Sequence, residues 1–237
     1  SDKTGTLTQN VMTVEKLQTV PGKEDWLNYA MILDNEVRFS QEEGLLGDST
    51  ETALVKYALE KGYSTAEADA AFPLLEKLPF DSVRMRMSTL HRHGDKWVLF
   101  VKGAPIKVTE ALAAPYKTQI PQWLNTNREW AAEGLRVLFF AYKVFDQKPS
   151  GIQTNIEADL DFLGMTAMID PPREEVIEAI KQCKTAGIKS VMITGDQPLT
   201  AQAIAERLQL TEKGNGDVKT GAELEKLTAE QFSEEIK

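Results

Sequence analysis

The first residues of the chain place an acidic side chain beside a tight turn, which suits phosphoryl chemistry. Asp2 is followed by Lys3, Thr4 and Gly5 in the string DKTGTLT. Because glycine allows a tight turn, an aspartate at the end of a strand can present its carboxylate to a phosphoryl group. Carboxylates act as nucleophiles in aspartyl-phosphate chemistry, and threonines with backbone N–H groups can hold phosphate oxygens. The alternative is an ordinary turn after a strand, which an isolated Asp and Gly would favour.

A second stretch, toward the other end of the chain, also has a phosphate-binding pattern. Residues 190–193 predict an apolar strand, and the polar loop Thr-Gly-Asp at 194–196 follows it. Asp196 can cap a helix that begins at Pro198, a favoured first position, and extends to about Leu208. A strand, a loop with glycine and a helix N-terminus form a common phosphate-binding arrangement.

The elements between these stretches predict an α+β region. Residues 46–62 predict a helix entered through Asp48-Ser49-Thr50, and residues 75–105 predict antiparallel strands joined by a turn at 93–95. The alternating apolar residues of these strands predict a half-buried sheet. A helix from Pro121 to about Glu133 should precede a shorter strand over 136–145.

From about Asp161 onward the chain alternates short apolar runs with helical segments, which is typical of α/β architecture, and Pro171-Pro172 interrupts this pattern as a rigid joint. Residues 174–187 predict a helix that ends at Gly187 and places Cys183 on its buried face. The last stretch, from about Ala222, predicts an acidic helix.

The complete string DKTGTLT resembles the phosphorylation signature of P-type cation-transporting ATPases. Six further strings resemble the cytoplasmic motifs of that family and follow in its order: GDSTETAL (47–54), PFDS (79–82), KGAP (102–105), GLRVL (134–138), DPPR (170–173) and TGD (194–196). One short string would be weak evidence, but this series covers most of the chain. Its character is that of the calcium-pump-like branch.

The resemblance implies a fold of mixed α/β and α+β class. Residues 10–170 would form the nucleotide-binding (N) domain, an antiparallel sheet with flanking helices. This domain would be inserted in a partial haloacid-dehalogenase-like, Rossmann-type phosphorylation (P) domain made of residues 1–9 and 171–237. The family's later GDGxND-type loop is missing, so we expect a cytoplasmic fragment of a larger membrane protein, at the cytoplasmic face of the membrane.

At the phosphorylation site, the resemblance implies a role for each matching residue. Asp2 would be the phosphorylated nucleophile and a ligand of Mg²⁺, to which Thr4 would add its backbone carbonyl. The phosphate oxygens would be held by Lys3, Thr194 and Gly195, with Asp196 beside them.

At the nucleotide site, the resemblance implies that Phe80 stacks on adenine while Lys102 and Gly103 lie deep in the adenine pocket. Glu51 would accept a hydrogen bond from the region of the base, and Arg136 would meet the phosphates as a forked donor. Alternatively, Phe80 and Lys102 are plain strand residues, and Glu51 is a solvated carboxylate that stabilises its own helix.

Two local features leave alternatives open. The family commonly carries a basic residue where Met85 stands, so Arg84 or Arg86 would have to hold the nucleotide phosphates, or binding would be weaker. His91 and His93 are the only histidines, and a metal site there is conceivable. They flank a predicted hairpin turn without a cysteine partner, which favours a structural role.

Thr4 bears on the fate of an aspartyl phosphate. Soluble phosphatases of the same superfamily usually place a second aspartate two residues after the nucleophile, as a general acid and base. A threonine cannot do this proton transfer. An aspartyl phosphate at Asp2 should therefore persist, as a transport intermediate must.

Composition restricts the alternatives. The 237 residues carry a net charge of -9 and a single cysteine, which argues against a nucleic acid partner and forbids an internal disulfide. The expected ligands are ATP and Mg²⁺, and the expected partners of a monomeric fragment are the transmembrane and actuator domains of the same pump. The whole protein would transfer the γ-phosphoryl of ATP to Asp2 to drive transport of an ion, with calcium favoured by the resemblance. The fragment alone is expected to be inactive; a soluble phosphatase and a nucleotide sensor are the alternatives.

Overall fold

The computed structural model describes residues 1–40, 42, 44–152, 156–195, 198–212, 218–228 and 231. The chain divides into two compact units. The larger unit consists of Met12–Trp130 and Arg136–Ile169; the smaller consists of Ser1–Val11, Ala131–Leu135 and Asp170–Lys237. The domain assignments 1–9, 10–170 and 171–237 remain predictions.

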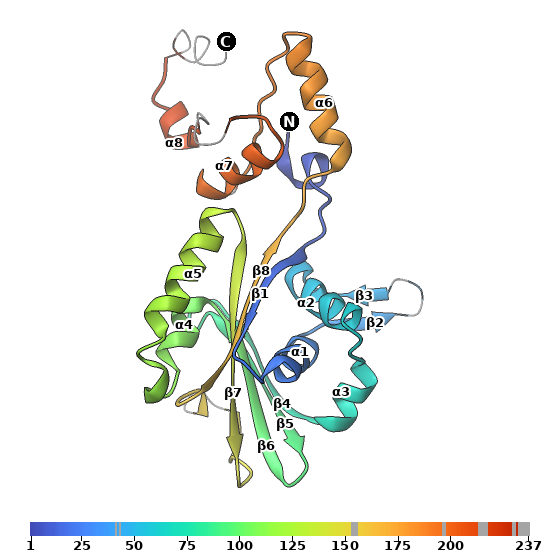
Figure 1. Ribbon diagram of the computed structural model, residues 1–237, viewed down its shortest axis with the longest axis vertical. Coiled ribbons are helices and arrows are strands. Elements are labelled where there is room, and N and C mark those ends of the chain that lie inside the picture. The colour runs from blue at the N-terminus through green and yellow to red at the C-terminus, as the bar shows by residue number, and fades with distance from the viewer. Residues whose placement is uncertain are drawn as a thin grey trace. The chain divides into compact units, whose positions relative to one another are not determined.

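The larger unit is built on one antiparallel sheet of six strands (Figure 1). In spatial order the strands are β1 (Thr13–Thr19), β8 (Asp161–Ile169), β7 (Arg136–Phe145), β6 (Lys96–Gly103), β5 (Arg86–His93) and β4 (Leu74–Asp81). The predicted hairpin is confirmed, because His93 pairs with Lys96 across Gly94, which has a φ of 57°. The strand over 136–145 is also confirmed, although at ten residues it is not short.

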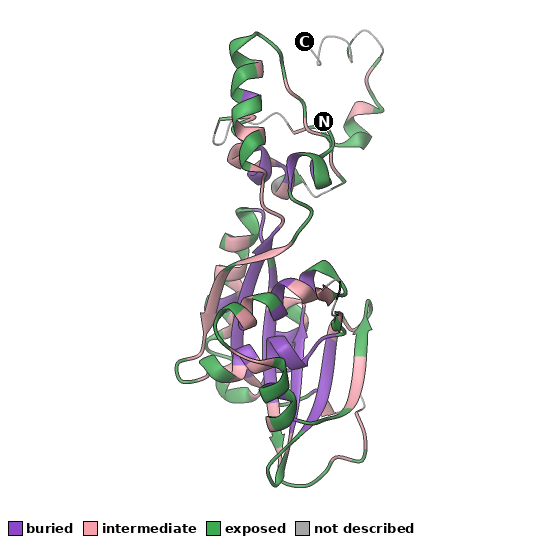
Figure 2. Ribbon diagram, turned by 90° about the vertical axis from the view of Figure 1, so that its right-hand side faces the viewer, coloured by how far each residue is buried: buried purple, intermediate pink, exposed green. Residues whose placement is uncertain are grey.

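Helices cover both faces of this sheet, so the prediction of a half-buried sheet was wrong for its centre. One face packs against α1 (Glu24–Leu33), α2 (Ser49–Glu60) and α3 (Thr65–Ala71), through a core that includes Leu27, Leu54, Phe72 and Phe100. On the other face, Trp123 of α5 (Ile120–Ala132) stacks on Phe162 at a centroid distance of 3.9 Å. Strands β5 and β6 are consequently buried along most of their length (Figure 2).

The remaining elements of the larger unit are short. They are the hairpin β2 (Arg38–Ser40) and β3 (Gly44–Leu46), the helix α4 (Pro105–Glu110) and the 3₁₀ turn η2 (Ala114–Tyr116). The helix predicted within residues 46–62 is confirmed as α2, and the Asp48 side chain caps it by accepting the Thr50 N–H at 2.8 Å.

The smaller unit contains the turn η1 (Lys3–Leu7) and the helices α6 (Glu174–Thr185), α7 (Pro198–Arg207) and α8 (Gly221–Leu224). The predictions of α6 and α7 are confirmed, whereas the acidic C-terminal helix is a single turn within the described residues. The strand predicted at 190–193 forms no ladder; it makes one parallel bridge, between Ile193 and Asp2. Cys183 is only half-buried, because little packs over this face of α6 among the described residues.

None of the described helices combines the length and the apolar character needed to cross a membrane.

Candidate functional site

The proposed lysine of the nucleotide site, Lys102, is almost fully buried near the end of β6. Its ammonium donates to Glu51 Oε1 at 2.7 Å, to the backbone oxygen of Asp34 and to Met87 Sδ at 3.3 Å. We refer to Asp34, Glu51, Met87 and Lys102 as the Lys102 cluster. A buried ammonium needs such partners, because an unpaired charge in the protein interior is very unfavourable.

The N-terminal turn of α2 joins two of the predicted residues. Glu51 binds Lys102 through one oxygen, and its Oε2 accepts the Glu36 N–H at 2.9 Å. The neighbouring Thr50 accepts a hydrogen bond from Arg136 Nη1 at 2.8 Å. Arg136, at the start of β7, is otherwise exposed, so its guanidinium can turn toward a ligand. The structure therefore excludes the alternative of Glu51 as a solvated carboxylate and brings it together with Lys102 and, through Thr50, with Arg136.

Phe80 and Gly103 lie near the same end of the sheet, at the ends of strands β4 and β6. Asp81 pairs with Arg86, and Arg86 pairs with Gly103, so Phe80 is two strands away from Lys102 and Gly103, or about 10 Å at the usual strand spacing. The residue Phe80 is 62% exposed, which is unusual for a phenylalanine in a strand. At Gly103 a Cβ would lie 2.5 Å from the Met85 oxygen, so only glycine fits there.

Asp34 was missed by the sequence reasoning. It follows α1, is completely buried, and neither of its carboxylate oxygens meets a donor in hydrogen-bonding geometry among the described residues. Burial raises the pKa of Asp34 to about 7, and the charge of Lys102 opposes the rise. A single aspartate after a helix gives no signal in the sequence that would separate it from an exposed one.

Arg84 and Arg86 are not free to take the place of the basic residue that Met85 replaces. Both guanidiniums bind Glu157, with Arg86 Nε 2.8 Å from Glu157 Oε2, and Ser88 donates to the same carboxylate. We refer to Arg84, Arg86, Ser88 and Glu157 as the Glu157 cluster. Glu157 was also missed, because it lies some 70 positions from its partners in the sequence.

In the smaller unit, Asp2 is exposed and its backbone is paired rather than loose. Lys3 N–H donates to the Ile193 oxygen at 3.0 Å, and Ile193 N–H donates to the Ser1 oxygen at 2.8 Å. This parallel pairing brings Asp2 and Lys3 next to Thr194, which directly follows Ile193. The structure thus joins the two phosphate-binding patterns found far apart in the sequence.

The loop formed by residues 2–8, the Asp2 loop, is held by the DPPR string. Thr8 donates to Asp170 Oδ2 at 2.5 Å, while Arg173 donates to the backbone oxygens of Thr8 at 2.9 Å and Gly5 at 3.2 Å. Gly5 has a φ of 74°, which favours glycine and lets the loop turn under this clamp. The DKTGTLT and DPPR strings, which are far apart in the sequence, are therefore in direct contact in the structure.

The other predicted residues of this site are partly described. Lys3 is buried, Thr4 and Gly195 are exposed, and Thr194 is half-buried. Asp196 lies outside the described residues, so its predicted place beside the phosphate stays a prediction.

The two histidines have separate structural partners. His91 is buried, its Nδ1 lies 2.8 Å from the Phe72 oxygen, and burial lowers its pKa to about 4. His93 Nδ1 lies 3.0 Å from the Ala71 oxygen, and its ring stacks on Phe72. The described residues contain no group of three or more metal-ligating side chains. These contacts favour the structural role of both rings.

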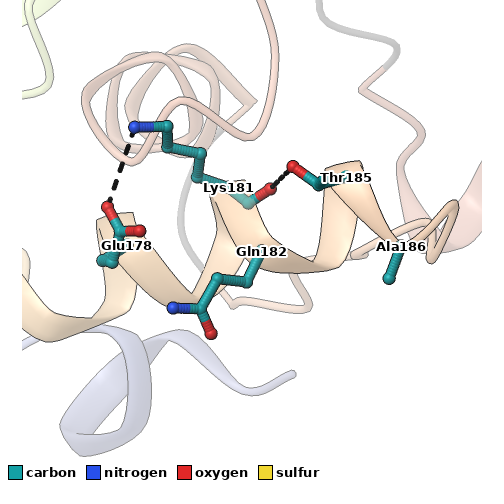
Figure 3. A pocket seen from close by; sticks show the side chains of 5 residues that line it. All are labelled: Glu178, Lys181, Gln182, Thr185 and Ala186. Carbon is teal, nitrogen blue, oxygen red and sulfur yellow. Dashed lines mark hydrogen bonds and ion pairs between the residues drawn. The ribbon is translucent and has the colours of Figure 1, made fainter.

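A hollow of about 350 Å³ lies on one side of α6 (Figure 3). Its lining comes from a single helix: Glu178, Lys181, Gln182, Thr185 and Ala186. Lys181 pairs with Glu178 at 3.9 Å, and Thr185 donates to the Lys181 oxygen at 2.9 Å. Binding sites usually gather polar groups from several elements, so this hollow is not the candidate site.

Comparison with known families decides what kind of chain this is. A family model described as "P-type ATPase, cytoplasmic domain N" matches residues 25–175. The chain belongs to the P-type ATPase family. The antiparallel sheet with flanking helices is accordingly the N domain of a P-type ATPase.

Similar curated P-type ATPases come from several bacteria. The chain is 37% identical to calcium-transporting ATPase 1 of Lactococcus lactis and 34% identical to a calcium-transporting ATPase of Listeria monocytogenes, in both cases over 100% of the chain and 29% of the relative. It is 36% identical to a probable cation-transporting P-type ATPase of Mycoplasma genitalium, over 95% of the chain and 26% of the relative. The chain thus spans less than a third of the length of these relatives.

Proposed function

We propose that this chain is the ATP-binding and phosphoryl-accepting cytoplasmic part of an ATP-driven cation pump. The whole protein would transfer the γ-phosphoryl of ATP to Asp2 and use the energy to move an ion, most simply calcium, across a membrane. Family membership and the names of two relatives support this proposal. The transmembrane and actuator domains would belong to the remaining length of the pump, and the smaller unit to a haloacid-dehalogenase-like phosphorylation domain.

The observation that carries the nucleotide site is the buried ion pair of Lys102 and Glu51 on the sheet that also displays the exposed Phe80 ring. In this proposal Phe80 stacks on adenine, and the close backbone at Gly103 lets the base approach the sheet. Lys102 and Glu51 then offer a donor and an acceptor to the base, and Arg136 leaves Thr50 to bind phosphate oxygens. Base stacking on an aromatic ring contributes about 1 to 3 kcal/mol.

At the phosphorylation site, an Asp2 carboxylate oxygen would attack the γ-phosphorus. The new bond joins this oxygen to phosphorus, while the bond between phosphorus and the β–γ bridging oxygen breaks and ADP leaves. Lys3, Thr194, Gly195 and Asp196 are the residues proposed to surround the transferred group. Thr4 cannot act as a general base toward water, which would let the aspartyl phosphate persist.

The donors around Asp2 suit Mg²⁺, which prefers hard oxygen ligands. Asp2 is exposed and can offer its carboxylate, and Thr4 can offer its backbone carbonyl from the turn η1. When bound, the ion would neutralise charge on the phosphates and on the attacking carboxylate. Asp2 and Thr4 would supply only part of its coordination, and phosphate oxygens and water can supply more.

The nucleotide site can be tested by titrating the 237-residue chain with ATP and adenosine and following amide chemical shifts. We expect shifts around Gly47–Glu51, Phe80 and 102–104. Phe80→Ala should lower the affinity for both ligands about 5- to 100-fold, as the loss of base stacking predicts. Arg136→Ala should weaken ATP more than adenosine, because a guanidinium acts on phosphate charge. Equal losses for the two ligands in Arg136→Ala would remove its proposed role.

The phosphorylation site needs a different assay. In a protein extended to the length of the relatives, acid-stable, hydroxylamine-sensitive label from γ-labelled ATP should appear and should vanish in Asp2→Asn. Label that persists in Asp2→Asn would exclude this residue as the nucleophile. The same assay on the 237-residue chain tests the prediction that it is inactive by itself.

A further inference from the structure

Glu157 is a buried carboxylate that the proposed chemistry does not use. Its side chain is completely buried and binds both Arg84 and Arg86, whose side chains are 11% and 15% exposed. Ser88 Oγ donates to it as well. Desolvating three charges is unfavourable unless their geometry has a compensating role, so an arrangement of this kind often specifies one conformation.

The partners of the two arginines show which conformation is specified. Arg84 Nη2 donates to the Pro79 oxygen at 2.7 Å, directly before Phe80. Arg86 Nη1 donates to the Lys107 oxygen at 3.1 Å, just beyond the KGAP string. One carboxylate therefore fixes the backbone on both sides of the proposed adenine site.

The turn between β4 and β5 also has hydrogen bonds of its own, and none of them involves the side chain of Phe80. Met85 has a φ of 52°, a strained value for a residue with a side chain, and its oxygen accepts the Ala104 N–H at 2.9 Å. Asp81 Oδ1 accepts the N–H groups of Val83 and Arg84 at 3.0 and 2.8 Å. Because Phe80 is 62% exposed, packing covers only part of the residue, and the position of its ring depends also on the backbone of this turn.

We propose that Glu157 is a positioning residue for the nucleotide site, which it serves by holding the β4–β5 turn and hence the Phe80 platform through Arg84 and Arg86. The inference rests on the proposed binding of adenine by Phe80. In this proposal Glu157 contacts only protein groups. Substituting it should therefore weaken binding of the adenine base, while binding of the phosphates still depends on Arg136.

The test compares Glu157→Gln, Phe80→Ala and the double variant in adenosine and ATP titrations of the 237-residue chain. A glutamine has the same shape but only one acceptor oxygen and no charge for two guanidiniums. We expect Glu157→Gln to lower the affinities for adenosine and ATP equally, by about 3- to 10-fold, because part of the stacking contribution is lost. The double variant should bind within about twofold of Phe80→Ala, because residues that act as one unit are not additive.

Glu110→Gln is the matched control, because Glu110 also pairs with a basic side chain, that of Lys107, but at the surface, where the Glu110 side chain is 54% exposed. It should leave affinity unchanged. If Glu157→Gln does not fold, Arg84→Lys removes the bond to Pro79 and keeps the charge, and the same losses are expected.

Two results would overturn the proposal: unchanged adenosine affinity in a folded Glu157→Gln chain, or losses that multiply in the double variant. A Phe80→Ala chain that binds normally would instead refute the proposed role of Phe80. In that case the amide shifts of the ligand-free chain decide about Glu157. Changed Phe80 and Gly103 signals in Glu157→Gln support positioning, and unchanged signals refute it.

Discussion

In the larger unit the charged side chains proposed to meet the nucleotide already have internal partners, whereas in the smaller unit the proposed nucleophile Asp2 is exposed and only its backbone is fixed. Lys102 and Glu51 hold each other in a buried ion pair. Asp2 is placed by the parallel bridge to Ile193, and its loop is clamped by Asp170 and Arg173. The comparison teaches that one site is held through its own functional side chains, whereas the other is held through the backbone of its loop. Substitutions should therefore act differently in the two units.

The largest effect should come from Lys102→Met. It leaves Glu51 and the Asp34 oxygen in the interior without the ammonium, and removing one partner of a buried pair costs about 3 to 5 kcal/mol. Urea unfolding measures this loss, which should be accompanied by lost adenosine binding. Lys56→Met is the control, because Lys56 pairs with Glu60 on the surface of α2 at 3.9 Å and its loss should stay within about 0.5 kcal/mol. Similar losses in both variants would refute the ordering role of the Lys102 cluster.

The second effect concerns pH and again should arise in the larger unit. Burial raises the pKa of Asp34 from 3.8 to about 7, so between these values the folded chain keeps a proton that the unfolded chain has released. Stability from this group falls as pH rises through that window, by up to about 1.4 kcal/mol per pH unit. Lys102, Glu51 and Glu157 are the charged groups that act on Asp34.

His91 opposes this dependence. Burial lowers its pKa from 6.5 to about 4, so the unfolded chain holds the extra proton in this window and stability rises with pH. Asp34→Asn should therefore turn a weak dependence between about pH 4 and 6.5 into a steep rise of the free energy of unfolding with pH. Denaturation at several pH values measures it, and Asp95→Asn, fully exposed, should keep the wild-type profile. Matching profiles in the two variants would show that Asp34 is ionised throughout.

The third prediction compares two glycines, Gly103 of the KGAP string in the larger unit and Gly195 of the TGD string in the smaller unit. Gly103→Ala would bring a Cβ to 2.5 Å from the Met85 oxygen and should cost about 1 to 3 kcal/mol, whereas a Cβ at Gly195 would meet nothing within 4 Å among the described residues. Gly195→Ala should therefore change the free energy of unfolding by less than about 0.5 kcal/mol. Equal costs in the two variants would contradict the close approach at the sheet edge.

The smallest effect is expected at the clamp of the smaller unit. Arg173→Lys keeps the charge but loses the forked bonds to Thr8 and Gly5, so we expect a local loss of about 1 kcal/mol. Amide hydrogen exchange at Thr8 and Gln9 should become about fivefold faster, because each 1.4 kcal/mol is a factor of ten. Lys181→Met on exposed α6 should leave this exchange unchanged. Accelerated exchange throughout the larger unit would show that Arg173 is not a local clamp.

The sequence predicted the elements whose signals are local. The Asp48 cap predicted the start of α2, and Gly94 predicted the hairpin between β5 and β6, because both act within a few residues. Motif resemblance then selected Glu51 and Lys102 of the Lys102 cluster, together with residues of the Asp2 loop. It could not show that Glu51 binds Lys102, because this contact depends on how α2 packs against β6.

The features that the sequence did not predict depend on residues far away along the chain. Nothing near Glu157 indicates two arginines as partners, and nothing near Asp34 indicates complete burial. The half-burial of Cys183 and the single bridge at Ile193 depend on what packs around them, which helical and strand periodicity do not contain. Burial of the second face of β5 depends on the distant segment around Glu157, which binds Arg86 and Ser88.

The pairing of β1 with β8 has a consequence for synthesis of the chain. Thr13 bonds to Ile169, 156 positions away, and the bridge of Asp2 must wait longer still, for Ile193. Long loops close slowly, and contacts of high sequence separation delay folding. On the ribosome, where N-terminal segments normally fold first, strand β1 and the Asp2 loop would emerge well before the segments that pair with them, strand β8 and Ile193. The bridge that positions the proposed nucleophile would thus form only after the residues between Asp2 and Ile193 have been synthesised.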